Sequence, residues 1–192
     1  MRIAQIAPLA ESVPPKLYGG TERVVAWLAD ELVELGHQVT LFASGDSKTR
    51  ADLVQAWPRA LRLGRPRSDP MAAQAVLLEL MAQHASKFDV LHCHIDWVQL
   101  PLLNRIDVPY LTTCHGRLDL PGLSSVIGHF PNAPFVSISK STAPITAGPL
   151  AGHSLSWAST SIIASVLRSG QVPCIPGPPG CRERPRGCYS NS

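Results

Sequence analysis

A pair of glycines between a strand-like run and a helix-like run is the sequence feature that most constrains the fold of this chain. Gly19 and Gly20 follow the apolar residues 3–6 and precede a segment whose apolar side chains recur every three or four positions. Gly36 stands where that helix would end. Paired glycines at such a turn let a ligand approach bare backbone, and the free N–H groups of the first helical turn attract an anion. The alternative is a tight turn with Thr21 as the N-cap.

Strand-like and helix-like runs alternate from the amino terminus to about residue 141. Strand, helix, strand at this rhythm predicts an α/β fold: a three-layer Rossmann-like domain with a parallel sheet and helices on both faces. Ligands of such sheets bind beyond the carboxyl ends of the strands, where we expect Gly19, Gly20, His94 and His115. The expected strands are residues 2–6, 38–43, 90–93, 110–114 and 135–139, and the expected helices are residues 21–35 and 71–84.

The chain changes character near residue 141. We therefore expect a folded domain over residues 1–141, followed by a poorly ordered, irregular tail over residues 142–192. The tail holds 7 of the 18 prolines and 3 of the 5 cysteines, a composition typical of segments without a packed core. Its cysteines lack the spacing of a zinc site, and a disulfide framework is not expected in a cytoplasmic protein.

Composition and charge exclude several classes of function. The apolar content of 45% and the mean hydropathy of +0.07 fit a soluble globular protein. No apolar run approaches the roughly 20 residues of a membrane span, and no signal peptide precedes the first strand, so we expect a cytoplasmic protein. Peripheral attachment to a membrane and the oligomeric state stay open. Residues 1–141 carry 13 basic and 13 acidic side chains, so no nucleic-acid partner is expected.

Six short segments occur in an order that points to one family. They are RIAQIAP (residues 2–8), YGGTERV (18–24), ELGHQVTLFA (34–43), FDVLHCH (88–94), TTCHG (112–116) and VSIS (136–139). The set resembles the amino-terminal domain of family-4-type retaining glycosyltransferases, whose two Rossmann-like domains face each other across a cleft (the GT-B fold). The resemblance implies transfer of a sugar from a nucleotide diphosphate sugar to the hydroxyl of an unknown acceptor, with retention.

The resemblance also implies roles for five residues. Gly19 and Gly20 would lie against the donor diphosphate, which agrees with the anion argument above. His115 would be the catalytic residue beside the transferred sugar, holding its hydroxyls or helping to position the leaving group. The alternative for His115 is a core histidine bonded to backbone. His94 and Glu22 are candidate sugar or acceptor contacts, and Glu22 in the first helical turn also suits a partner of the helix dipole.

Cofactors and metals give two further alternatives. His92 and His94 share one face of a strand, as a two-histidine metal site would require, but no third ligand is visible. The resemblance implies no protein-held metal, so we expect neither a metal nor a cofactor. A nicotinamide-dependent oxidoreductase would share the strand–glycine–helix start. It would need a G-x-G-x-x-G motif and an acidic residue after the second strand, where residues 42–44 read Phe-Ala-Ser.

The resemblance calls for a second domain with a basic pair for the diphosphate and a carboxylate motif for the ribose and sugar. Codons for residues 172–192 can be chosen so that reading one base later gives YLAFLGRLGAEKGPEAAIRI, which resembles the opening of that domain. We therefore expect a chain truncated or frameshifted before the second domain, and hence a catalytically inactive fragment. The codons of the gene test this hypothesis, because codons that cannot spell this string would refute it.

Overall fold

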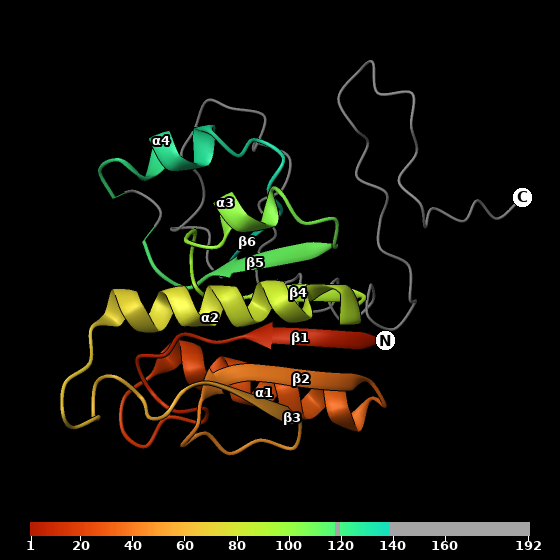
Figure 1. Ribbon diagram of the computed structural model, residues 1–192. Coiled ribbons are helices and arrows are strands. Elements are labelled where there is room, and N and C mark those ends of the chain that lie inside the picture. The colour runs from red at the N-terminus through yellow and green to blue at the C-terminus, as the bar shows by residue number, and fades with distance from the viewer. Residues whose placement is uncertain (118–119, 139–192) are drawn as a thin grey trace, which may run out of the picture. The chain divides into compact units, whose positions relative to one another are not determined.

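The computed structural model describes residues 1–117 and 120–138 of the chain. This part forms a six-stranded sheet with helices packed against it (Figure 1). The boundary expected at residue 141, the tail over residues 142–192 and the segment 172–192 lie outside the described residues.

The elements agree with most of the sequence expectations. The expected strands are all present, although β2 runs one residue longer than predicted and β6 ends at Ser137, before residue 138 of the prediction. The two expected helices each begin one residue earlier, and the first also ends one residue earlier. The short elements η1, α3 and α4 and the edge strand β3 were not predicted. The strands are β1 (Arg2–Ile6), β2 (Gln38–Ser44), β3 (Asp52–Trp57), β4 (Val90–Cys93), β5 (Tyr110–Cys114) and β6 (Phe135–Ser137). The helices are α1 (Gly20–Glu34), α2 (Pro70–His84), the 3-10 helix η1 (Ala85–Lys87), α3 (Leu100–Leu103) and α4 (Leu123–Gly128).

The sheet has the strand order β3-β2-β1-β4-β5-β6, and every neighbouring pair is parallel. This arrangement confirms the predicted α/β fold with a parallel sheet. The chain moves outward from β1 through β2 to β3, then returns to the other side of β1 and continues through β4 to β6. The order therefore reverses between β1 and β4. Such a topological switch point leaves a crevice beyond the strand ends, where ligands of open α/β sheets bind.

Helices cover both faces of the sheet, as the sequence predicted. Figure 1 shows α2 in front of the strands and α1 behind β2 and β3. Alternate strand residues point to opposite faces, so each helix meets a different set of side chains. The α2 cluster contains Ala73, Leu77 and Met81 with Ala4, Ile6, Phe42, Leu91 and Cys93 of the strands. The α1 cluster contains Val25 and Ala26 with Leu41 and Ala43.

The ends of α1 are set by glycines. Gly19 is the N-cap and no side chain bonds to the first turn, so the alternative of Thr21 as N-cap is wrong: Thr21 already lies inside the helix. At the other end Gly36 adopts a φ of 85°, which L side chains rarely adopt. The amide of Gly36 donates to the Val33 carbonyl at 2.9 Å and that of His37 to the Leu32 carbonyl at 3.0 Å. This confirms the predicted helix stop at Gly36.

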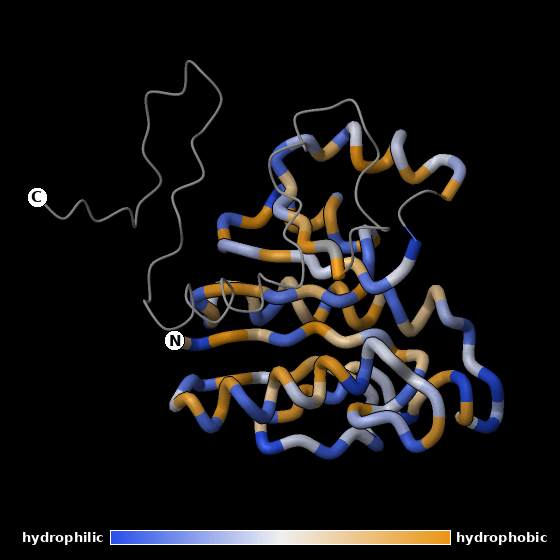
Figure 2. Tube along the Cα trace, turned by 180° about the vertical axis from the view of Figure 1, so that it is seen from behind, coloured by the Kyte–Doolittle hydropathy of each residue, from blue (hydrophilic) through white to orange (hydrophobic). Residues whose placement is uncertain are grey.

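The hydropathy of the chain follows these layers. Figure 2 shows hydrophobic residues concentrated along the interior strands and hydrophilic residues along much of the connecting loops. Helices α1 and α2 have 15 residues each, whereas crossing a bilayer takes about 20 apolar residues. Within residues 1–117 and 120–138, no helix is long and apolar enough to span a membrane.

Candidate functional site

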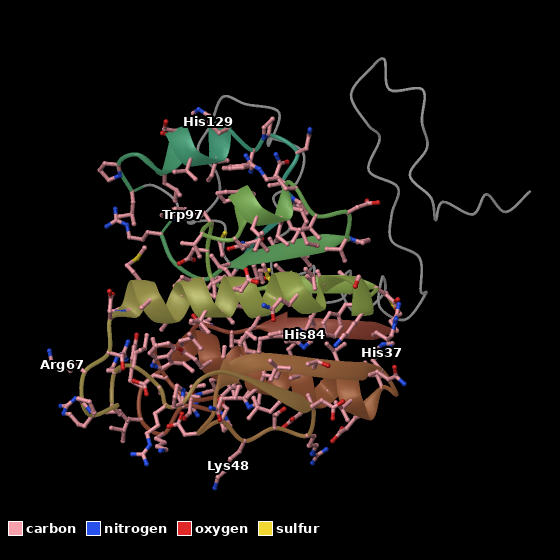
Figure 3. All side chains as sticks on the ribbon, in the orientation of Figure 1. His37, Lys48, Arg67, His84, Trp97 and His129 are labelled. Atoms are coloured by element: carbon pink, nitrogen blue, oxygen red, sulfur yellow. The ribbon has the colours of Figure 1, made fainter. Side chains whose placement is uncertain are left out.

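Three neighbouring strands bring the predicted site residues to one edge of the sheet. The loop after β1 leads to Gly19 and Gly20, His94 directly follows β4, and His115 directly follows β5. In parallel strands the carboxyl ends meet at the same edge, and β1 and β4 flank the switch point. Trp97, labelled in Figure 3, lies at this edge, whereas His37, which precedes β2, lies at the opposite one.

The structure brings His94 and His115 into direct contact. Nδ1 of His94 lies 2.9 Å from Nε2 of His115, and the ring centroids are 5.2 Å apart. His94 is buried and His115 is half-buried. The second nitrogen of His94, Nε2, lies 2.8 Å from Oε1 of Gln5 on β1. The alternative of a core histidine bonded to backbone does not describe His115, since its ring bonds to another side chain.

His92 extends the same network on the same face of the sheet. Its Nε2 lies 2.8 Å from Oγ1 of Thr113 on β5, and its Nδ1 lies 3.4 Å from Nε2 of Gln5. The ring centroids of His92 and His94 are 4.1 Å apart, as the alternation along β4 predicted. All four ring nitrogens of this pair are thus engaged in hydrogen bonds. In the part of the chain that the structure describes, no three His, Cys, Asp or Glu side chains gather to hold a metal ion.

Burial keeps the three imidazoles uncharged. Desolvation lowers the pKa of His92 to about 3 and that of His115 to about 4. Desolvation, together with the neighbouring His92 and His115, holds the pKa of His94 well below its ordinary value of 6.5. The cluster therefore adds no positive charge to the site near neutral pH. It offers neutral ring nitrogens, which give or accept hydrogen bonds rather than pair with phosphate as cations.

The glycine turn presents one crowded position and one open position. A Cβ on Gly19 would lie 2.7 Å from Cβ of Pro15 and 2.8 Å from Oε2 of Glu22, whereas a Cβ on Gly20 would meet nothing within 4 Å. Glu22 is buried, with 4% of its surface exposed, and its carboxylate lies beside the start of α1, which supports a helix-dipole role. An anion that reached the uncapped first turn would therefore approach from the side of Gly20.

A cavity of about 100 Å³ opens between the loops that follow β4 and β5. The residues that line it include Asp96, Trp97, Cys114, Arg117, Leu120, Leu123, Ile127 and Phe135. Asp96 adopts a φ of 59°, a strained conformation that Asp tolerates better than most residues. The residue as a whole is exposed, but partial desolvation of its carboxyl group raises its pKa.

The sequence analysis did not single out four polar residues that shape this edge, namely Gln5, Asp96, Gln99 and Thr113. Gln5 and Thr113 bind the histidine rings, and Gln99 holds the loop that carries Asp96. Its Nε2 donates to the Asp96 carbonyl at 3.0 Å and to Oγ1 of Thr112 at 2.9 Å. Gln5 did carry a signal, because it is the one amide in the apolar run of residues 3–7. The strained backbone of Asp96 left no mark in the sequence.

Comparisons with known proteins identify the domain. The family model described as Glycosyltransferase Family 4 matches residues 18–144, more than half of the 192 residues. No curated protein matches the sequence.

Solved structures with a similar fold include two glycosyltransferases. Sucrose-phosphate synthase from Thermosynechococcus elongatus matches with 18% identity and a TM-score of 0.51, covering 72% of this chain and 42% of that one. A second structure under the same protein name matches with 18% identity and a TM-score of 0.55, covering 88% of this chain and 98% of that one. MurG from Acinetobacter baumannii matches with 12% identity and a TM-score of 0.50, covering 76% of this chain and 43% of that one. The chain thus spans about two fifths of the longer sucrose-phosphate synthase chain and of MurG, and these likenesses show the GT-B-type fold alone.

Proposed function

This chain belongs to glycosyltransferase family 4, and on that premise we propose that its domain holds the acceptor and one side of a nucleotide diphosphate sugar during retaining glycosyl transfer. The observation that carries the proposal is the His94–His115 contact at the carboxyl ends of β4 and β5, next to the switch point. Retention rests on the family resemblance. Buried free thiols at Cys93 and Cys114 support a reducing compartment such as the cytoplasm.

The donor side of the proposal is the start of α1. Its first turn has no side-chain cap, so backbone N–H groups are available to diphosphate oxygens. Gly20 leaves open space for that approach, while Glu22 beside Gly19 disfavours an anion on the other side through like charge. The neutral ring of His115 would then face the sugar, since an uncharged imidazole suits hydroxyl groups better than phosphate.

The acceptor side of the proposal is the cavity beside Asp96. A volume of about 100 Å³ is somewhat smaller than the ~150 Å³ cavity that holds a benzene ring, so it admits part of an acceptor rather than a whole disaccharide. The exposed ring of Trp97 offers an apolar surface, and the carboxyl group of Asp96 offers a hydrogen-bond partner for a hydroxyl.

Ligand-observed NMR on the 192-residue chain tests the proposal. UDP-sugars and GDP-sugars at millimolar concentration are expected to bind, and NADH serves as the comparison ligand for the oxidoreductase alternative. His115→Ala is expected to weaken binding of the nucleotide sugars but not of UDP or GDP alone, because His115 faces the sugar. The matched control is His129→Ala, which removes an exposed imidazole. Binding of NADH alone, or no effect of His115→Ala, would contradict the proposal.

Glycosyl transfer is measured separately from ligand binding. The resemblance assigns the cations that stabilise the departing diphosphate to a second domain, and such stabilisation is a large part of the rate of group transfer. We therefore expect the 192-residue chain to bind without measurable transfer when it is incubated with labelled nucleotide sugars and a pool of acceptors. Turnover above background hydrolysis that His115→Ala abolishes would show that the chain is catalytically competent.

A further inference from the structure

One amide group lies between two buried imidazoles in this domain. Gln5 is fully buried in the central strand β1, with its Oε1 2.8 Å from Nε2 of His94 and its Nε2 3.4 Å from Nδ1 of His92. An amide has one end that only donates and one end that only accepts. Its orientation therefore determines which nitrogen of each ring carries the proton.

The proton positions follow along the chain of contacts. Oε1 of Gln5 can only accept, so Nε2 of His94 carries the proton, and the neutral ring leaves its Nδ1 bare. That bare Nδ1 accepts from Nε2–H of His115 across 2.9 Å. On the other side, Nε2 of Gln5 donates to Nδ1 of His92, whose Nε2–H donates to Oγ1 of Thr113 across 2.8 Å. Every contact then joins one donor to one acceptor.

We propose that Gln5 is a positioning residue that fixes, through His94, the ring tautomer of His115, so that His115 presents a bare Nδ1 toward the ligand. Within the described residues that nitrogen has no hydrogen-bond partner, and His115 is half-buried at the strand edge. A bare ring nitrogen accepts a hydrogen bond from a hydroxyl and repels a phosphate oxygen. The identity of the ligand rests on the proposed function: His115 faces a sugar or acceptor hydroxyl and not the leaving diphosphate.

The side chain at position 5 is an amide and not a carboxylate, and this difference affects the charge of the neighbouring imidazoles. A carboxylate beside His94 would favour a charged imidazolium, as in catalytic triads, whereas an amide takes up no proton and stabilises no charge. The low pKa values of the three histidines agree with a network of neutral rings. Gln5 thus sets a hydrogen-bond direction without forming a path for a proton.

Long-range ¹H–¹⁵N spectra of the histidine rings test the proposal on the full chain without any ligand. At neutral pH His115, identified by comparison with His115→Asn, is expected to show one tautomer, with the proton on Nε2. Gln5→Met keeps the side-chain length but removes the amide, and it is expected to give comparable populations of both tautomers. Gln99→Met is the matched control, since Gln99 is equally buried but contacts Thr112 and Asp96 instead.

Two results would overturn the proposal. One is a proton on Nδ1 of His115 in the wild-type chain, and the other is an unchanged tautomer in folded Gln5→Met. If Gln5→Met does not fold, Gln5→Glu decides, because a carboxylate beside His94 favours the imidazolium, whose Nδ1–H donates to Nε2 of His115 and moves the proton of His115 to Nδ1. An unchanged Nε2–H tautomer of His115 in folded Gln5→Glu would count against Gln5 as the residue that sets it.

A ligand measurement separates this inference from the proposed function. Gln5→Met is expected to weaken binding of a UDP- or GDP-sugar by about tenfold, the upper range for one lost hydrogen bond, and to leave UDP and GDP unaffected. The expected tautomer without any sugar-nucleotide binding would contradict the proposed function alone. Sugar-nucleotide binding with His115 protonated on Nδ1 would contradict the inference about Gln5 alone.

Discussion

Around β1, β4 and β5 the two faces of the sheet differ in chemistry although the same strands build both. On the face under α2, Ala4, Ile6, Leu91 and Cys93 are buried among apolar side chains. On the opposite face, positions one residue along hold Gln5, His92 and Thr113, which are also buried but bond to one another.

The two faces contribute differently to the folding stability of the domain and to the orientation of its side chains. Apolar packing depends on volume and tolerates many combinations of side chains, whereas a buried polar network is stable only when each donor meets an acceptor. The α2 face therefore supplies much of the free energy of folding, and the opposite face fixes where the histidine rings point.

Acidification is expected to destabilise the protein chiefly through the polar face. The folded chain keeps three histidines neutral: the pKa is about 3 for His92 and about 4 for His115, and for His94 it lies well below 6.5. Histidines in the unfolded chain titrate near 6.5. Between about pH 6.5 and 4 the unfolded chain binds more protons, so the free energy of unfolding falls as the pH decreases. The slope reaches about 1.4 kcal/mol per pH unit for each neutral histidine.

Urea denaturation over a pH series measures this slope. His115→Gln is expected to lower the slope by up to about 1.4 kcal/mol per pH unit, which is the contribution of one proton. The exposed His129→Gln controls for the removal of an imidazole elsewhere. A free energy of unfolding that stays constant between pH 7 and pH 5 would show that the folded chain does not hold these rings neutral.

Truncating a side chain on the apolar face is expected to lower stability at every pH. Leu77 is fully buried in the cluster under α2, so Leu77→Ala removes apolar contact and leaves a cavity, at a loss of about 2–5 kcal/mol. Val76→Ala on the same helix is the control, since Val76 is 41% exposed and its loss should stay within about 0.5 kcal/mol. Equal losses for the two variants in urea denaturation would contradict the placement of the core.

The two glycines are expected to respond differently to the same substitution. Gly19→Ala places a methyl group within 2.8 Å of Pro15 and Glu22, and such overpacking costs about 1–3 kcal/mol. Gly20→Ala meets no atom and should be neutral or stabilising by up to about 1 kcal/mol. Thermal unfolding of both variants measures the difference, and a larger loss for Gly20→Ala would place the crowded position one residue later than described.

The smallest effect is expected at the amino edge of the sheet. The guanidinium of Arg2, hydrogen-bonded to Asp89, lowers the pKa of that carboxyl group, and the two groups lie 2.6 Å apart with side chains 52% and 38% exposed. Water and salt screen such a pair, so Asp89→Asn is expected to cost about 0.2–1 kcal/mol. The loss should shrink in 1 M salt, and a loss that is independent of salt would point to the backbone bond from the Arg2 amide instead.

The sequence predicted the central strands well because their signal is local. Short apolar runs marked β1, β4 and β5, and Gly36 marked the end of α1. Edge strand β3 escaped because its first two residues are exposed and it pairs only with β2, so no continuous apolar run forms.

The contents of the site were harder to predict, because they depend on contacts between distant segments. His94 and His115 were found from the family motifs and from the rule that ligands bind at strand carboxyl ends. The partnership of Gln5 with His92 joins residues 87 positions apart, which no local window covers. Whether Glu22 contacts a ligand stays a prediction, although its burial beside Gly19 was not foreseen.

The central position of β1 also fixes an order of events in time. As the chain is synthesised, β1 can pair with β2 early, but its other edge stays open until β4, about 87 residues later, has emerged. Contacts of such sequence separation form slowly, and an open strand edge invites association between chains. The histidine network is thus among the last features to assemble, after the glycine turn and α1 are already in place.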